Sequence, residues 1–100
     1  ISKNNFIKLK KGMIVSNEPG IYLENRLGIR IENLVYIDGN NKNLFFKNLT
    51  LAPLEKDLID ENMLTKIEKD YIFSYHLETY SKLSAYLNNK ERKWLAKLIQ

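Results

Sequence analysis

The sequence predicts an α+β fold in which an antiparallel β meander is followed by a helical segment. Short runs rich in β-branched and aromatic residues, separated by turn residues, fill the first half of the chain. After Pro53 the apolar residues recur at three- and four-residue steps, which is the period of an α-helix. We therefore expect two parts, residues 1–52 and residues 53–100.

Three strands are expected in the first part, and each has its own pattern. Residues 13–17 form a short β-rich run, and residues 29–37 alternate between apolar and polar side chains, as a strand with two different faces does. Residues 44–54 form a third run, which Pro53 ends because proline has no N–H to donate to a sheet. Turns are expected at Pro19-Gly20, at residues 25–28 and at residues 38–43.

Two helices are expected after Pro53. Thr65 followed by Glu68 is a capping box, which marks the start of a helix. This helix is expected to bury an apolar stripe over about five turns, made of Tyr71, Ile72, Tyr75, Thr79, Leu83 and Leu87. Asn88-Asn89 can end it and begin a second helix, whose inner face is expected to be Trp94, Leu95 and Leu98. Both stripes indicate core or interface packing rather than a cofactor site.

The composition excludes several classes of protein. A chain of 100 residues makes at most one ordinary domain, and 44% hydrophobic with 28% charged residues is typical of a globular chain. Without cysteine there is no disulfide framework and no thiolate metal site. No apolar run approaches the roughly 20 residues that a membrane span needs. We expect a cytoplasmic location and, since Ile1 stands where an initiator Met would be, a fragment or processed product.

The net charge of +4 arises entirely in the first half of the chain. Residues 1–52 hold eight Lys or Arg against four Asp or Glu, whereas residues 53–100 hold eight of each. Residues 8–11 form the one dense basic run, and they lack the aromatic interleaving or recognition motif of a nucleic-acid site. A solvated surface, or the loss of an acidic partner segment, therefore explains the charge better than nucleic-acid binding.

Two carboxylates lie in apolar runs that read as strands, and this is the chemical question that the sequence raises. Burying an ionised carboxylate costs several kcal/mol or more unless it is paired or bound to a metal. Arg30 and Glu32 share a face about 6.6–7 Å apart along one strand, and a hairpin could bring Glu18 beside Glu32. Three interpretations stay open: a metal site, a solvated face with an Arg30–Glu32 pair, and an acid/base carboxylate pair. Carboxylate oxygens suit Mn or Mg better than Zn, but two ligands are too few for a catalytic ion.

The strings around these acids resemble a known family. "GMIVSNEPGIY" followed by "GIRIENLVYI" is similar to the last two metal-ligand motifs of the aminopeptidase P/prolidase group of dinuclear metallopeptidases, which have the pita-bread fold. The tail, with "FKNLTLAPLEKDLID", "YIFSYH" and "WL", resembles the C-terminal extension of the cytosolic three-domain form. The resemblance covers essentially the whole chain. It implies that residues 1–52 are an incomplete part of the catalytic domain and that residues 53–100 are the helical extension.

The resemblance also implies a role for each residue of the site. Glu18 would bind one metal ion, and Glu32 would bridge two ions, with manganese expected and zinc or cobalt as alternatives. Arg30 would hold carboxylates in orientation, and Tyr22 would reach towards metal-bound solvent or an aspartate ligand. Related methionine aminopeptidases tend to carry Gln where Arg30 stands, so the substrate implied is a peptide with proline at its second position.

The chain departs from this family because the other ligands, two aspartates and a histidine, would precede the first motif. His76 lies far downstream in a predicted helix, where a packing or hydrogen-bonding role is expected instead. The isolated chain is therefore expected to be inactive without the upstream half of the catalytic domain. A homodimer through the helical part is a further expected partner, whereas nucleic acid and membrane are not. The alternatives are a non-catalytic fragment of the same fold, used for protein binding or dimerisation, and a nucleic-acid-binding module.

Overall fold

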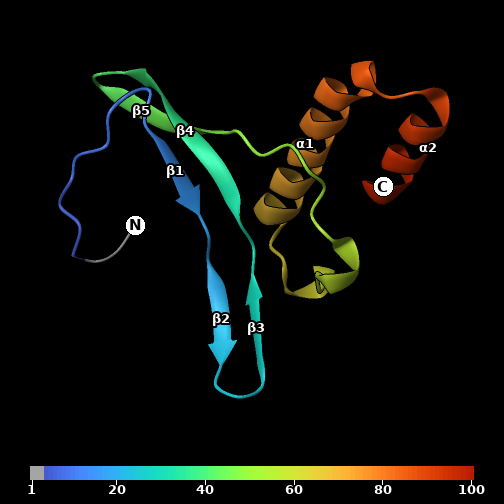
Figure 1. The fold of residues 1–100 in the computed structure, drawn as a ribbon, viewed down its shortest axis with the longest axis horizontal. Coiled ribbons are helices and arrows are strands. Elements are labelled where there is room, and N and C mark those ends of the chain that lie inside the picture. Colours follow the sequence, from blue (N-terminus) through green and yellow to red (C-terminus); the bar gives the residue numbers. More distant parts are fainter. Residues whose placement is uncertain (1–3) are drawn as a thin grey trace. The chain divides into compact units, whose positions relative to one another are not determined.

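The computed structural model describes residues 4–100, and it has antiparallel strands followed by helices, as the sequence predicts (Figure 1). The chain divides into two compact units, Ile1–Thr50 and Leu51–Gln100. The first unit contains the strands, which are β1 (Ile14–Asn17), β2 (Gly20–Leu23), β3 (Leu27–Arg30), β4 (Asn33–Asn40) and β5 (Asn43–Asn48). They pair as a three-stranded sheet in the order β1-β4-β5 and as a separate two-stranded β2-β3 ladder.

The β1-β4 and β2-β3 ladders are two parts of one long hairpin, because they share a single register. In every antiparallel pair of both ladders, from Ile14↔Tyr36 to Leu23↔Leu27, the two residue numbers add up to 50. The ladder is interrupted at Pro19, which has no N–H to donate, although its carbonyl still accepts a 3.1 Å hydrogen bond from the Ile31 N–H. The expected turn at Pro19-Gly20 is therefore wrong, since the chain continues straight through it.

The chain reverses at residues 24–26, where Asn25 takes a left-handed conformation with φ of 56°. The Arg26 N–H closes this turn with a 3.0 Å hydrogen bond to the Leu23 carbonyl. The expected loop at residues 25–28 was thus placed slightly late, because β3 already begins at Leu27. The tip fixes the register of the whole hairpin, and with it the face on which each side chain lies.

The second hairpin is tighter than the sequence predicts. The expected turn at residues 38–43 shrinks to Asn41-Lys42, because β4 runs on to Asn40. The Asn40 side-chain oxygen accepts 3.0 Å hydrogen bonds from the N–H groups of residues 42 and 43, which stabilises the reversal. β5 ends at Asn48, so the expected strand 44–54 is shorter than predicted. The buried Val35 and Ile37 lie on β4, the central strand of the sheet.

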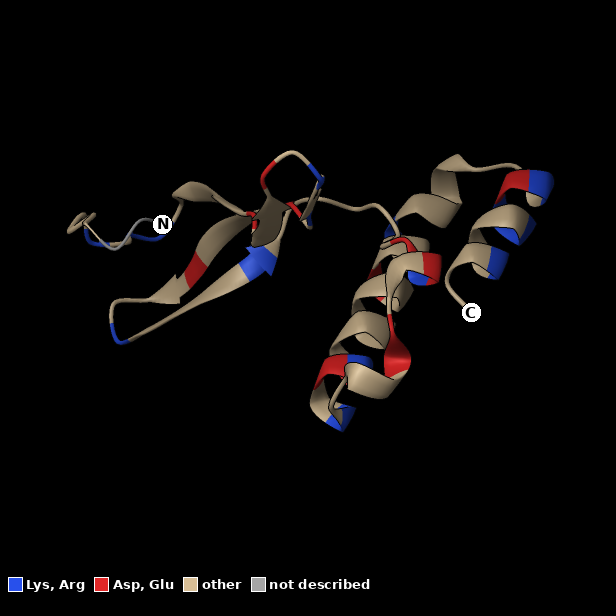
Figure 2. Ribbon diagram, turned by 90° about the horizontal axis from the view of Figure 1, so that it is seen from below, with Lys and Arg blue, Asp and Glu red and all other residues tan. Residues whose placement is uncertain are grey.

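The second unit is helical. It contains the 3₁₀ turns η1 (Lys56–Leu58), η2 (Glu61–Met63) and η3 (Ser84–Tyr86), and the helices α1 (Lys66–Leu83) and α2 (Asn89–Leu98). The predicted capping box at the start of α1 is confirmed, because Thr65 and Glu68 exchange both hydrogen bonds. Asn88 caps α2 in the same way with Glu91. Lys and Arg are interspersed with Asp and Glu along these helices (Figure 2).

The helical core agrees only in part with the predicted stripes. Tyr75, His76 and Thr79 of α1 are buried, and so is Leu95 of α2. Tyr71 and Trp94, which were expected to face inward, are 56% and 63% exposed. α1 ends at Leu83, and a 3₁₀ turn follows, so Leu87 does not extend the helical stripe. None of the helices in residues 4–100 is long and apolar enough to cross a membrane.

Candidate metal centre on the long hairpin

Glu18 and Glu32 face one another at the interruption of the hairpin ladder. The shared register pairs Glu18 with Glu32, since their numbers also add up to 50. The neighbouring odd-numbered pairs are hydrogen-bonded, as the Ile31 N–H to Pro19 carbonyl bond shows, so this pair belongs to the non-hydrogen-bonded class. Such partners have Cα atoms only about 4.5 Å apart and side chains on the same face of the sheet. The two carboxylates are therefore neighbours on one face, as the sequence analysis considered.

Arg30 and Tyr22 belong to the same cluster. The Arg30 guanidinium lies 3.0 Å from a Glu32 carboxylate oxygen, and both side chains are largely exposed. A hydrogen bond with Tyr22 and the attraction of Glu32 are the main causes that raise the pKa of Arg30, and Glu18 adds to them. The fixed positive charge of Arg30 therefore interacts with each of the other three groups expected at the site.

Tyr22 lies flat over two glycines. Gly28 is its partner across the β2-β3 ladder, and Gly20 lies two residues before it on the same face. A Cβ atom built on Gly28 would lie 2.9 Å from Tyr22 Cδ1, and one on Gly20 would lie 2.8 Å from Tyr22 Oη. The ring therefore occupies the space that these two residues leave empty. The sequence pattern alone does not predict this position of the ring.

The cluster can supply part of a metal centre but not all of it. Carboxylate oxygens in adjacent positions are the hard donors that Mn²⁺ and Mg²⁺ prefer, so the donor set fits such an ion. Within residues 4–100, however, no group of three or more His, Asp or Glu side chains could hold a metal ion. Both glutamates are exposed in this chain. A complete centre on this face needs ligands from outside the described residues.

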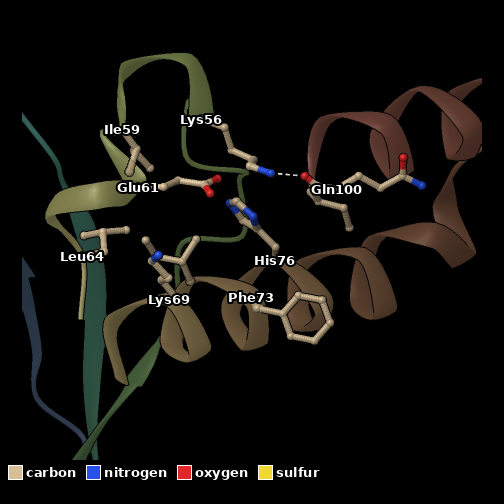
Figure 3. A pocket seen from close by; sticks show the side chains of 10 residues that line it. Lys56, Ile59, Glu61, Leu64, Lys69, Phe73, His76 and Gln100 are labelled. Carbon is tan, nitrogen blue, oxygen red and sulfur yellow. Dashed lines mark hydrogen bonds between the residues drawn. The ribbon is translucent and has the colours of Figure 1, made fainter. Parts of the chain in front are cut away.

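His76 belongs to the helical unit and has a structural role, as expected. Its Nε2 accepts a 3.0 Å hydrogen bond from the Leu54 N–H, which ties the segment after the strands to α1. Burial lowers the pKa of His76, and the nearby charge of Lys56 lowers it further. The imidazole borders a pocket of about 150 Å³ in which Lys56 donates a hydrogen bond to the Gln100 carbonyl (Figure 3). The Nε2 atom of the neutral ring is therefore already engaged in accepting the Leu54 hydrogen bond.

Comparison with known proteins places this chain in a family. Residues 1–39 match the model described as metallopeptidase family M24, and residues 42–100 match the model described as the C-terminal region of peptidase M24. The second match alone covers more than half of the chain, so the chain belongs to the M24 metallopeptidase family. The first match lies in the strand-containing half of the chain and the second runs from there through the helices.

Within the M24 family, the chain is similar to several curated peptidases, most of them named as Xaa-Pro aminopeptidases. The chain is 43% identical to an uncharacterized peptidase of Schizosaccharomyces pombe, over 93% of this chain and 17% of the relative. It is 40% identical to a probable Xaa-Pro aminopeptidase P of Coprinopsis cinerea, over 95% of this chain and 17% of the relative. It is 39% identical to aminopeptidase P2 of Arabidopsis thaliana, over 91% of this chain and 14% of the relative. The chain thus spans about one sixth of the length of the curated relatives it matches.

A solved structure extends the similarity to three dimensions. The X-prolyl aminopeptidase of Caenorhabditis elegans, described as a cytosolic enzyme with a di-nuclear active site, is 28% identical to this chain with a TM-score of 0.85. The similarity covers 99% of this chain and 18% of that enzyme. The antiparallel strands followed by helices therefore match the fold of part of this pita-bread aminopeptidase.

Proposed function

We propose that this chain is the C-terminal part of a dinuclear metal-dependent aminopeptidase that removes the N-terminal residue from peptides with proline at the second position. One observation carries the proposal: Glu18 and Glu32 face each other across the hairpin, with Arg30 and Tyr22 beside them. The similarity to Xaa-Pro aminopeptidases over nearly the whole chain supports the substrate class. Residues 1–52 would then be the end of the catalytic domain and residues 53–100 its helical extension.

In this proposal each side chain of the cluster has one task. Glu18 would hold one ion and Glu32 would hold both, which is the role that the family resemblance implies for these two neighbouring carboxylates. Two divalent ions held there would supply the chemistry of a metal-activated water and a polarised scissile carbonyl, with manganese proposed and zinc or cobalt as alternatives. The 3.0 Å ion pair with Arg30 keeps the Glu32 carboxylate in one orientation, and Tyr22 holds Arg30 from the other side.

The remaining ligands must come from the preceding half of the catalytic domain, which we propose as the main partner of this chain. The short share of its relatives that the chain spans supports this proposal. A cytoplasmic location is proposed because the C. elegans enzyme is described as cytosolic. A homodimer through the helical unit is proposed on the exposed aromatic side chains of Tyr86 and Trp94. Neither nucleic acid nor a membrane is proposed as a partner.

The proposal is tested by cleavage of X-Pro peptides by the full-length protein with added manganese. Removing an outer-shell partner of a metal typically costs 10–100-fold, so loss of a ligand in Glu32→Gln should lower kcat more than about 100-fold. Glu24→Gln is the matched control, because Glu24 is an exposed carboxylate at the tip of the same hairpin, outside the cluster. Unchanged turnover in Glu32→Gln, or equal losses in both variants, would contradict the assigned role.

A further inference from the structure

We propose that Gly20 and Gly28 are positioning residues of the metal centre, because the space they leave empty is the seat on which the Tyr22 ring lies. The inference rests on the proposed function, since it explains how the orientation of Glu32 is maintained. The line of contacts runs from the two glycines to Tyr22, then to Arg30, and from Arg30 to Glu32.

The backbone conformation does not require glycine at either position. Within residues 4–100, the glycines with positive φ are Gly12 and Gly39, and neither belongs to β2 or β3. Gly20 and Gly28 have ordinary strand conformations, which an alanine adopts at least as readily as a glycine. If its only role were to continue the strand, alanine would be neutral or stabilising at Gly28. At Gly20 a Cβ atom would also lie 3.0 Å from the Ile29 carbonyl, so the backbone contributes there as well.

The Tyr22 ring supplies the requirement instead. A Cβ atom on Gly28 would lie 2.9 Å from Tyr22 Cδ1 and 3.3 Å from Cε1. A Cβ atom on Gly20 would lie 2.8 Å from Tyr22 Oη and 3.0 Å from Cε2. The ring thus extends diagonally from one glycine to the other, with the hydroxyl end over Gly20. A methyl group at either position would displace the ring, because carbon atoms do not approach this closely.

Displacement of the ring reaches the ligand through Arg30. Arg30 is the ladder partner of Gly20, so the Tyr22 hydroxyl, lying over Gly20, is held beside the guanidinium. The same guanidinium lies 3.0 Å from Glu32. Tyr22 is 65% exposed, and its ring is held by the space over the two glycines together with the hydrogen bond to Arg30. Without that seat, the hydroxyl loses its place against Arg30, and Glu32 becomes free to rotate.

Gly28→Ala in the full-length protein is the cleaner test, because the Gly20 Cβ position is also 3.0 Å from the Ile29 carbonyl. Four proteins are compared: wild type, Gly28→Ala, Tyr22→Ala and the double variant. Gly28→Ala should lower kcat and the affinity for Mn²⁺, measured by chelator competition, by roughly 10–100-fold, with little change in KM. In the Tyr22→Ala background the same substitution should have no further effect, because no ring remains to be displaced.

The outcomes separate this inference from the proposed function. Wild-type values in Gly28→Ala, or an equal loss with and without the Tyr22 ring, would overturn it. If Gly28→Ala does not fold, recovery of folding in the double variant supports the ring clash, and failure to recover overturns it. If wild type neither cleaves X-Pro peptides nor binds Mn²⁺, the proposed function fails. A crystal structure of Gly28→Ala then decides the inference by itself, since a ring in its original place overturns it.

Discussion

Two polar side chains of the helical unit, Tyr75 and His76, contrast with the two glutamates of the long hairpin. In the helical unit, Tyr75 and His76 are each 2% exposed, and both have partners in that unit. Tyr75 Oη donates a 2.8 Å hydrogen bond to the Ala52 carbonyl, and His76 Nε2 accepts one of 3.0 Å from the Leu54 N–H. On the hairpin, Glu18 and Glu32 are exposed neighbours of like charge. Internally satisfied polar groups stabilise the fold. The exposed carboxylates are instead consistent with the proposed site, which ligands from outside the described residues would complete.

The largest effect is expected when the proposed site lacks the metal ligands of the preceding half of the catalytic domain. The 100-residue chain alone should show no detectable cleavage of X-Pro peptides and only weak binding of Mn²⁺. The physical reason is that two adjacent carboxylates repel each other, and no third His, Asp or Glu lies near them in the described residues. Isothermal titration calorimetry of the chain with Mn²⁺ measures this directly. Two tight sites in the chain alone would show that the hairpin does not depend on the upstream half.

The next effect concerns the helical unit, whose order should depend on its own core. Leu95 is 3% exposed, so Leu95→Ala should lower the free energy of opening of α2 by about 2–5 kcal/mol. Hydrogen exchange of the α2 amides in the full-length protein measures this opening. Lys93→Ala is the matched control, because Lys93 lies on an exposed position of the same helix. Equal protection in the two variants would mean that α2 is held by contacts other than its buried leucine.

Local signals in the sequence predicted some elements, such as the start of α1, but not the strand β2 or the break between β3 and β4. The Thr65–Glu68 capping box works within one turn of helix, so it survives in any tertiary context. The predicted turn at Pro19-Gly20 was wrong, because a Pro-Gly dipeptide is compatible both with a turn and with an interrupted β-ladder. In the structure, Pro19 loses one hydrogen bond, and the strand continues with the same register on both sides. The strand continues through Pro19-Gly20 because the chain reverses later, at the turn around Asn25.

The sequence predicted which site residues share a face of the hairpin, because strand register alone determines this. Alternation along the strand placed Arg30 and Glu32 on one face, and a hairpin brought Glu18 to that face. The position of the Tyr22 ring over the two glycines could not be predicted from the sequence, because it depends on the direction in which the ring lies across two strands. The prediction that Trp94 faces inward was wrong. Leu95 is the one buried residue of this 10-residue helix, so the adjacent Trp94 is free to face outward.

The smallest expected effect is a pH dependence of the helical unit that comes from His76. Its pKa is lowered in the folded protein by burial and by Lys56, so the unfolded chain binds the proton more tightly. Stability is therefore complete above the unfolded value of about 6.5 and is lost as the pH falls below it, with a slope of at most about 1.4 kcal/mol per pH unit for one proton. Protonation also removes the acceptor for the Leu54 N–H.

The measurement is the opening free energy of α1 from hydrogen exchange at pH 7.5 and 5.5, corrected for intrinsic exchange rates. His76→Gln is the control, because glutamine offers a side-chain oxygen as acceptor but does not titrate. The other charged side chains of the pocket, Lys56, Glu61 and Lys69, are present in both proteins, so their contributions cancel in the comparison. Wild type should lose stability at the lower pH and His76→Gln should not. The same pH dependence in both would show that the satisfied histidine is not what makes the helical unit sensitive to acid.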